Sequence, residues 1–167
     1  QGDWSSDVCS SDLVDAELAD ARPHWTAEEE RRWTEWMAHL SGVELSREPK
    51  LLHWDLHHWN VMVDTDTGDL TAILDWGDAG FYDPAVDFAH AHLSTVAPQI
   101  RGFGGVPGPD FGARILKSAL IWILCEVPDL DEKFRRDWWC YPSGGMLEVA
   151  AIARTIPELE PWVPDLK

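Results

Sequence analysis

Residues 53–60 read HWDLHHWN, and residues 61–77 continue as VMVDTDTGDLTAILDWG. Asn60 lies five residues after Asp55, and a second aspartate, Asp75, directly follows an apolar run that ends at Leu74. Phosphoryl transfer uses such a set. One carboxylate orients and deprotonates the attacking hydroxyl, while a second carboxylate and an amide oxygen hold Mg²⁺ on the nucleotide phosphates. The stretch therefore indicates kinase-type chemistry.

The order H-x-D-x-x-x-x-N followed by D-x-G is the order of kinase catalytic and metal-binding loops. Residues 51–93, LLHWDLHHWNVMVDTDTGDLTAILDWGDAGFYDPAVDFAHAHL, resemble the aminoglycoside phosphotransferase family, which also includes choline, homoserine and fructosamine kinases. The family pattern is matched at His53, Asp55, Leu56, His57, Asn60, Asp75, Trp76, Ala79, Asp83, Pro84 and Asp87. The chain departs from it at Trp54, where the family often has Gly, and at Trp59, where a small residue is common.

The resemblance implies an α+β, mostly helical fold: the C-terminal catalytic lobe of a protein-kinase-like fold, with a short β-hairpin that carries the metal ligands. In that fold the Gly-rich loop, the phosphate-binding Lys and its Glu partner precede the catalytic loop. We find no candidate for these three between Gln1 and Lys50. Residues 14–167 are therefore expected to be a C-terminal lobe whose N-terminal lobe is missing.

The resemblance also implies the role of each site residue. Asp55 would be the catalytic base, and Asn60 and Asp75 would bind the cofactors ATP and Mg²⁺ through the metal. His53 would support the loop by hydrogen bonding, and His57 would meet the γ-phosphate or the acceptor. The substrate would be a small molecule that carries a hydroxyl group.

Three further residues near the motifs have weaker expectations. Asp87 resembles a buried anchor that ties the following helix to the backbone of the catalytic loop. Asp78 either lines the acceptor pocket or is solvated. His58 is expected to be exposed.

Residues 3–13, DWSSDVCSSDL, match one reading frame of a common sequencing-adapter oligonucleotide. We expect residues 1–13 to be non-native, with natural sequence beginning near Leu13 or Val14, and we exclude this segment from fold reasoning. A disordered natural terminus rich in Ser and Asp is the alternative.

The composition limits the partners of the chain. With 167 residues, one domain is the default. The formal net charge is −17, or −14 without Asp3, Asp7 and Asp12. Such an acidic chain is not expected to bind nucleic acid or an anionic membrane. It would attract a cationic acceptor, although acidity more often serves solubility. The few cysteines and the lack of a long apolar run indicate a cytoplasmic protein.

The first expected helix begins with a capping box, in which Thr26 is the N-cap and Glu29 occupies the third helical position. It carries Trp33, Trp36, Met37 and Leu40 on one face and would end near Gly42. Residues 61–63 and 70–74 read as two strands joined by the turn at residues 64–69. This hairpin would bring Asn60 and Asp75 to the same metal.

Further helices are expected downstream. Asp83 and Pro84 are typical of a helix start, at the N-cap and first helical positions, and that helix would run through Phe88 and Leu93 toward Pro98. Residues 102–112, rich in Gly and Pro, would form a loop. Helices are also predicted over residues 110–127, 131–139 and 146–154.

Other functions fit parts of the same sequence. His53, Asp55, His57 and His58, with His90 and His92, offer zinc ligands for a metallohydrolase, but this leaves Asn60 and the motif at residues 75–77 unexplained. A non-catalytic remnant and a protein kinase are further alternatives. Trp76 in place of Phe and the lack of an Ala-Pro-Glu segment disfavour a protein kinase. Among the tryptophans, Trp33, Trp36 and Trp122 are expected to be packing residues, and Trp138 and Trp139 are candidates for an aromatic cage.

Overall fold

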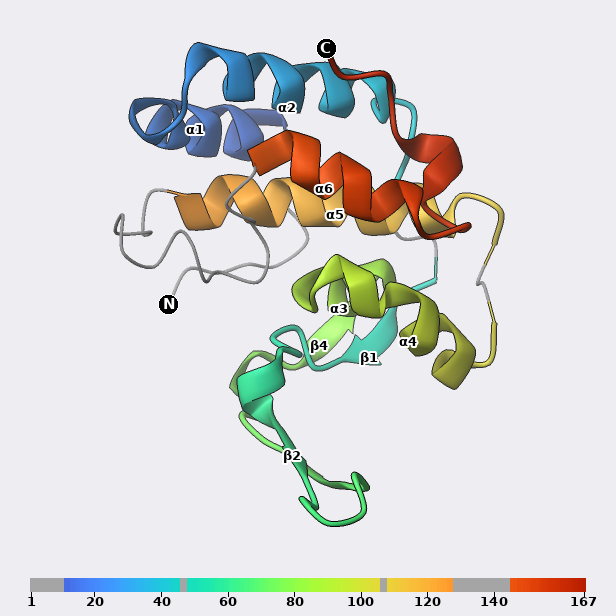
Figure 1. Cartoon of the computed structure of the whole chain (residues 1–167). Helices are drawn as coiled ribbons and strands as arrows, with labels where there is room; N and C mark the ends of the chain where they lie inside the picture. The colour runs from blue at the N-terminus through green and yellow to red at the C-terminus, as the bar shows by residue number, and fades with distance from the viewer. Residues whose placement is uncertain (1–10, 46–47, 106–107, 128–144) are drawn as a thin grey trace.

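The computed structural model describes residues 11–45, 48–105, 108–127 and 145–167. Four helices form its main body: α1 (Ser11–Ala21), α2 (Ala27–His39), α5 (Phe111–Glu126) and α6 (Gly145–Arg154). Figure 1 shows α1 and α2 on one side of α5 and α6, and α3 (Ala85–His90) and α4 (Val96–Phe103) on the other. No helix in the described ranges is long and apolar enough to cross a membrane.

The core lies where α5 meets its neighbours. Phe111, Ile115, Leu116 and Leu120 of α5 are fully buried, and α3 packs closely against the same helix. Two tryptophans of α2 close the other side: the indole N–H of Trp33 donates to the Leu120 carbonyl at 2.9 Å, and that of Trp36 to the Trp162 carbonyl at 3.0 Å. The prediction that both are packing residues is confirmed.

Two small antiparallel sheets flank the motifs at residues 53–60 and 75–77. Strand β1 (Lys50–Leu52) pairs with β4 (Gly80–Tyr82), with Leu51 opposite Phe81. Strand β2 (Val61–Val63) pairs with β3 (Leu70–Ile73), with Val61 opposite Ile73 and a bulge after Met62. The second pair is the predicted hairpin, which projects away from the helices at the bottom of Figure 1. The first pair was not predicted, because its strands lie about 30 residues apart in sequence and no local turn joins them.

Several predicted boundaries were wrong. Helix α1 was not predicted, and its first turn comes from Ser11–Leu13, which belong to the segment expected to be non-native. The helix expected to run from Pro84 through Leu93 toward Pro98 is interrupted, because Ala91 and His92 adopt extended and non-helical backbone conformations. A short 3₁₀ turn (Leu93–Thr95) then leads into α4, which extends to Phe103 and shortens the predicted loop.

Other predictions were confirmed. Helix α2 begins after Thr26, whose hydroxyl oxygen accepts a hydrogen bond from the Glu29 N–H at 3.2 Å, although α2 ends at His39 rather than at Gly42. The start of α3 differs from the prediction, because Pro84 rather than Asp83 is its N-cap, although the Asp83 carboxylate accepts a 2.9 Å bond from the Ala85 N–H. Helices α5 and α6 lie where the sequence predicts them. The helix predicted over residues 131–139 falls outside the described residues, as do Trp138 and Trp139.

Candidate active site

Asp87 holds the backbone of the catalytic loop. Its two carboxylate oxygens accept hydrogen bonds from the N–H groups of His53, at 3.0 Å, and Trp54, at 2.8 Å. Bonds from two consecutive amides to one carboxylate fix the chain directly before Asp55, and charged acceptors make such bonds strong. The predicted anchoring role of Asp87 is therefore confirmed.

Trp54 occupies the position at which the family often has glycine. Its φ of 71° lies in the left-handed region, which costs an L-residue with a Cβ about 1–2 kcal/mol. The indole is nevertheless buried among Leu52, Val86 and Tyr82, with its ring centroid 3.7 Å from that of Tyr82. The loop keeps a backbone suited to glycine, and the buried aromatic contact offsets the strain.

His53 links the catalytic loop to the end of the hairpin. Its Nδ1 accepts a bond from the Asp55 N–H at 3.3 Å, so its Nε2 carries the proton and donates to the Leu74 carbonyl at 2.6 Å. The ring is buried and makes an edge contact with Trp76 at 4.8 Å. The imidazole has both nitrogens engaged with the backbone, which supports the predicted structural role.

Asn60 and Asp75 lie at neighbouring ends of the paired strands. The Leu74 N–H donates to the Asn60 carbonyl at 2.8 Å, which places Asp75 one residue beyond the partner of Asn60. The side-chain amide nitrogen of Asn60 donates to the backbone oxygen and to Oδ2 of Asp55, both at 2.9 Å. Its amide oxygen is therefore the atom left for a ligand.

Asn60 and Asp75 are the residues that could hold a magnesium ion. Asp75 is exposed, and its φ of 57° is left-handed. An exposed carboxylate and an amide oxygen supply two hard ligands, and Mg²⁺ in phosphoryl-transfer enzymes takes its other ligands from water and phosphates. The structure brings the three residues predicted for the site, Asp55, Asn60 and Asp75, onto one loop and one hairpin.

Asp55 is held by polar groups on both oxygens. Besides Asn60 at Oδ2, His57 Nε2 lies 3.3 Å and His90 Nδ1 lies 3.8 Å from Oδ1. The His90 imidazole is the largest cause of a lowered pKa at the Asp55 carboxyl; His57 and Asn60 add to it, and partial burial opposes it. The carboxylate is therefore ionised at neutral pH and keeps 34% of its side chain exposed.

The two histidines that follow Asp55 differ in their surroundings. His57 Nδ1 accepts a bond from the Trp59 N–H at 3.2 Å, and its Nε2 faces Asp55 Oδ1 at 3.3 Å and the Asn60 amide nitrogen at 3.4 Å. His58 is exposed, as predicted. Trp59, the second departure from the family pattern, is 65% exposed and packs its ring edge-on against His57 at 5.6 Å.

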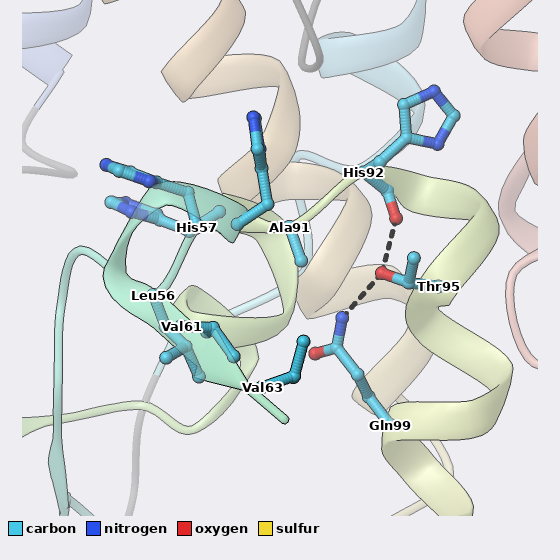
Figure 2. A pocket seen from close by; sticks show the side chains of 10 residues that line it. Leu56, His57, Val61, Val63, Ala91, His92, Thr95 and Gln99 are labelled. Atoms are coloured by element: carbon cyan, nitrogen blue, oxygen red, sulfur yellow. Dashed lines mark hydrogen bonds between the residues drawn. The ribbon is translucent and has the colours of Figure 1, made fainter. Parts of the chain in front are cut away.

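A pocket of about 500 Å³ lies beside the catalytic loop. Its wall comes from the loop, from β2, and from the segment between α3 and α4; the lining residues are Leu56, His57, His58, Val61, Val63, His90, Ala91, His92, Thr95 and Gln99. Figure 2 shows Leu56 and Val61 at the left and Thr95 and Gln99 at the right, with the Gln99 amide nitrogen bonded to the Thr95 hydroxyl at 2.7 Å. None of the ten lining residues is acidic or carries an ammonium or guanidinium group.

His90 is the site residue that our reading of the kinase motifs missed. It follows Asp87 by three residues on α3, a spacing that places both side chains on the same helix face, toward the catalytic loop. That spacing is visible in the sequence, but we had considered His90 only as a zinc ligand. Asp78 is exposed in a 3₁₀ turn (Trp76–Asp78) and does not line the pocket.

The zinc alternative gains no support from the geometry. Among the described residues, no three His, Cys, Asp or Glu side chains are arranged to hold a metal ion. His53 uses both ring nitrogens in backbone hydrogen bonds instead.

Comparison with known proteins identifies the family. No solved structure matches the chain. The model of the "Phosphotransferase enzyme family" matches residues 4–116, which is more than half of the chain and includes the catalytic loop, the hairpin and α3. The match begins inside the segment that resembles a sequencing adapter, whose origin stays a prediction. The predicted resemblance is confirmed: the chain belongs to the phosphotransferase enzyme family that includes aminoglycoside and choline kinases.

Proposed function

We propose that this site transfers the γ-phosphate of ATP to a hydroxyl group of a small molecule. The observation that carries the proposal is the side-chain contact between Asp55 and Asn60 on a loop anchored by Asp87, with Asp75 one residue beyond the strand partner of Asn60. Two oxygen ligands for a metal ion beside an ionised carboxylate are what phosphoryl transfer requires.

Asp55 acts as the base in this proposal. Its exposed carboxylate accepts the proton of the acceptor hydroxyl as the phosphoryl group is transferred. The Asn60 amide oxygen and the Asp75 carboxylate hold Mg²⁺, which neutralises charge on the phosphate oxygens when it is bound. Asn60 has two functions, because its amide nitrogen also fixes the Asp55 carboxylate.

We place the acceptor in the pocket beside the loop. Asp55 does not itself line the pocket, but His57 and His90 both do and lie within 3.8 Å of Asp55 Oδ1, so the base is adjacent to this wall. The net charge of −17 would draw a cation toward the protein, but no carboxylate lines the pocket. A cationic group of the acceptor would therefore find no ion-pair partner inside the pocket and is expected to lie outside it.

The 167-residue chain is expected to turn over slowly by itself. The Gly-rich loop and the phosphate-binding Lys, which clamp the nucleotide in kinases, have no candidate in this chain upstream of His53. The described residues would then supply the base and the metal ligands but not the nucleotide clamp.

A screen for phosphorylated products tests the proposal. The chain is incubated with Mg-ATP and a panel of aminoglycosides, choline-like amino alcohols, sugars and neutral alcohols, and products are detected by mass spectrometry. We expect slow product formation that Asp55→Ala abolishes and that Asp66→Ala, in the exposed hairpin turn, leaves unchanged. Equal product formation by Asp55→Ala and the original chain would reject Asp55 as the base.

A further inference from the structure

His90 occupies an unusual place for a titratable side chain. It is the last residue of α3, is only 3% exposed, and makes an edge contact with the Trp122 ring at 3.9 Å and an interplanar angle of 88°. Burying an imidazole costs free energy unless a polar partner compensates for the lost hydration. The polar residue that His90 faces is therefore the candidate for compensating its burial.

That residue is Asp55. His90 Nδ1 lies 3.8 Å from Asp55 Oδ1, which is longer than a formed hydrogen bond, but contacts of this kind often shorten when substrate binds. Burial lowers the pKa of His90, although the nearby Asp55 carboxylate opposes this. A neutral imidazole has one N–H, and Asp55 favours its position on Nδ1.

The two carboxylate oxygens of Asp55 have different neighbours. Asn60 donates to Oδ2, whereas His57 and His90 approach Oδ1 from the loop and from α3. Because Asp87 sits on the same helix and holds the loop backbone, α3 controls both the backbone before Asp55 and one oxygen of its side chain.

We propose that His90 is a positioning residue for Asp55: its neutral imidazole, protonated at Nδ1, holds Oδ1 so that the carboxylate has one orientation toward the pocket. The catalytic consequence of this contact rests on the proposed function, but the contact itself does not. His90 lines the pocket as well, so the same ring sets the distance between the base and whatever fills the cavity.

The tautomer of His90 tests the proposal without any turnover. Long-range ¹H–¹⁵N spectra of the ¹⁵N-labelled chain at neutral pH distinguish a proton on Nδ1 from one on Nε2. We expect His90 to carry its proton on Nδ1, and expect Asp55→Ala to shift the ring toward the Nε2–H form. Asp78→Ala, which removes an exposed carboxylate outside the pocket, should leave the tautomer unchanged.

A second spectroscopic arm examines Asp55 directly. His90→Asn keeps an N–H donor near the position of Nδ1, whereas His90→Leu has none. The ¹³C resonance of the Asp55 carboxyl should move in His90→Leu and stay close to its original position in His90→Asn. A merely structural role for His90 would not produce this rescue.

The outcomes separate the two proposals. A proton on Nε2 of His90, or an Nδ1–H tautomer that Asp55→Ala leaves unchanged, would overturn the positioning role whatever the activity. An Nδ1–H tautomer that responds to Asp55→Ala, in a chain without any phosphotransferase activity, would uphold the contact and count against the proposed function. If His90→Leu fails to fold, the Asp55→Ala comparison still decides.

Discussion

Trp54 makes two opposed contributions to the stability of the catalytic loop. Its left-handed backbone costs about 1–2 kcal/mol, whereas truncation of a buried Trp to Ala costs about 3–5 kcal/mol. The packing contribution is the larger one. The chain therefore tolerates tryptophan at a position whose backbone favours glycine.

Substitutions at Trp54 separate these contributions. Trp54→Ala loses the packing and keeps the strain, whereas Trp54→Gly loses the packing and relieves the strain. We expect both variants to be less stable than the original chain by more than about 2 kcal/mol, with Gly about 1 kcal/mol more stable than Ala. Urea denaturation measures both differences. A Gly variant less stable than the Ala variant would contradict the left-handed assignment.

The lowered pKa of the Asp55 carboxyl predicts that the free energy of unfolding depends on pH. Because its native pKa lies below the ordinary 3.8, the folded state favours the ionised form. This contribution is present above about pH 4 and is lost as the pH falls through the native pKa. The stability difference between the original chain and Asp55→Asn should therefore shrink below pH 4. Urea midpoints of both proteins between pH 7 and pH 3 test this, and a difference that grows toward low pH would contradict it.

At the scale of elements, local signals were sufficient for α2, the β2–β3 hairpin and α5. Thr26 and Glu29 marked the start of α2, and the polar turn at residues 64–69 marked the hairpin. The β1–β4 pair depends on contacts between residues about 30 apart in sequence, which no local pattern reports. The interruption after His90 was missed because the apolar residues on both sides keep a helical spacing.

Glu29 differs from its predicted role and connects two elements. The capping box predicts that its carboxylate returns to Thr26, but Oε2 accepts a 2.7 Å bond from the Met146 N–H at the start of α6. We expect Glu29→Ala to cost about 1–2 kcal/mol, since α6 loses an N-terminal hydrogen-bond acceptor. Glu28→Ala, which removes the ion pairs of an exposed carboxylate, should cost less than Glu29→Ala. Thermal or urea unfolding compares them, and equal losses would count against the α2–α6 link.

At the scale of the whole molecule, the sequence predicted the site better than its surroundings. The resemblance to the family implied the anchoring role of Asp87 and the supporting role of His53. The packing of α5 against the C-terminal segment was not, because it depends on close approach in space: a Cβ on Gly112 would overlap the Glu158 carbonyl oxygen. His90 was missed for a similar reason, since its importance appears only when α3 meets the loop.

Gly112 tests this close packing. Gly112→Ala should destabilise the chain by about 1–3 kcal/mol, because backbone atoms of residue 158 cannot move aside as a flexible side chain would. Gly102→Ala is the matched control: it lies in α4, and a Cβ there meets nothing within 4 Å. We expect the control to be neutral or stabilising by up to about 1 kcal/mol. Unfolding by urea measures both, and an equally stable Gly112→Ala variant would contradict the packing.

The central claim is that Asp55, Asn60 and Asp75 form a magnesium–nucleotide site. Calorimetric titration of the chain with ATP, with and without Mg²⁺, tests it most directly, using Asp75→Asn as the test variant and Asp66→Asn, in the exposed turn of the same hairpin, as the control. We expect magnesium-dependent binding. Asp75→Asn should weaken it at least about tenfold, because one charged metal ligand is lost, whereas Asp66→Asn should leave it unchanged. Binding that does not depend on magnesium, no binding, or equal binding by both variants would contradict it.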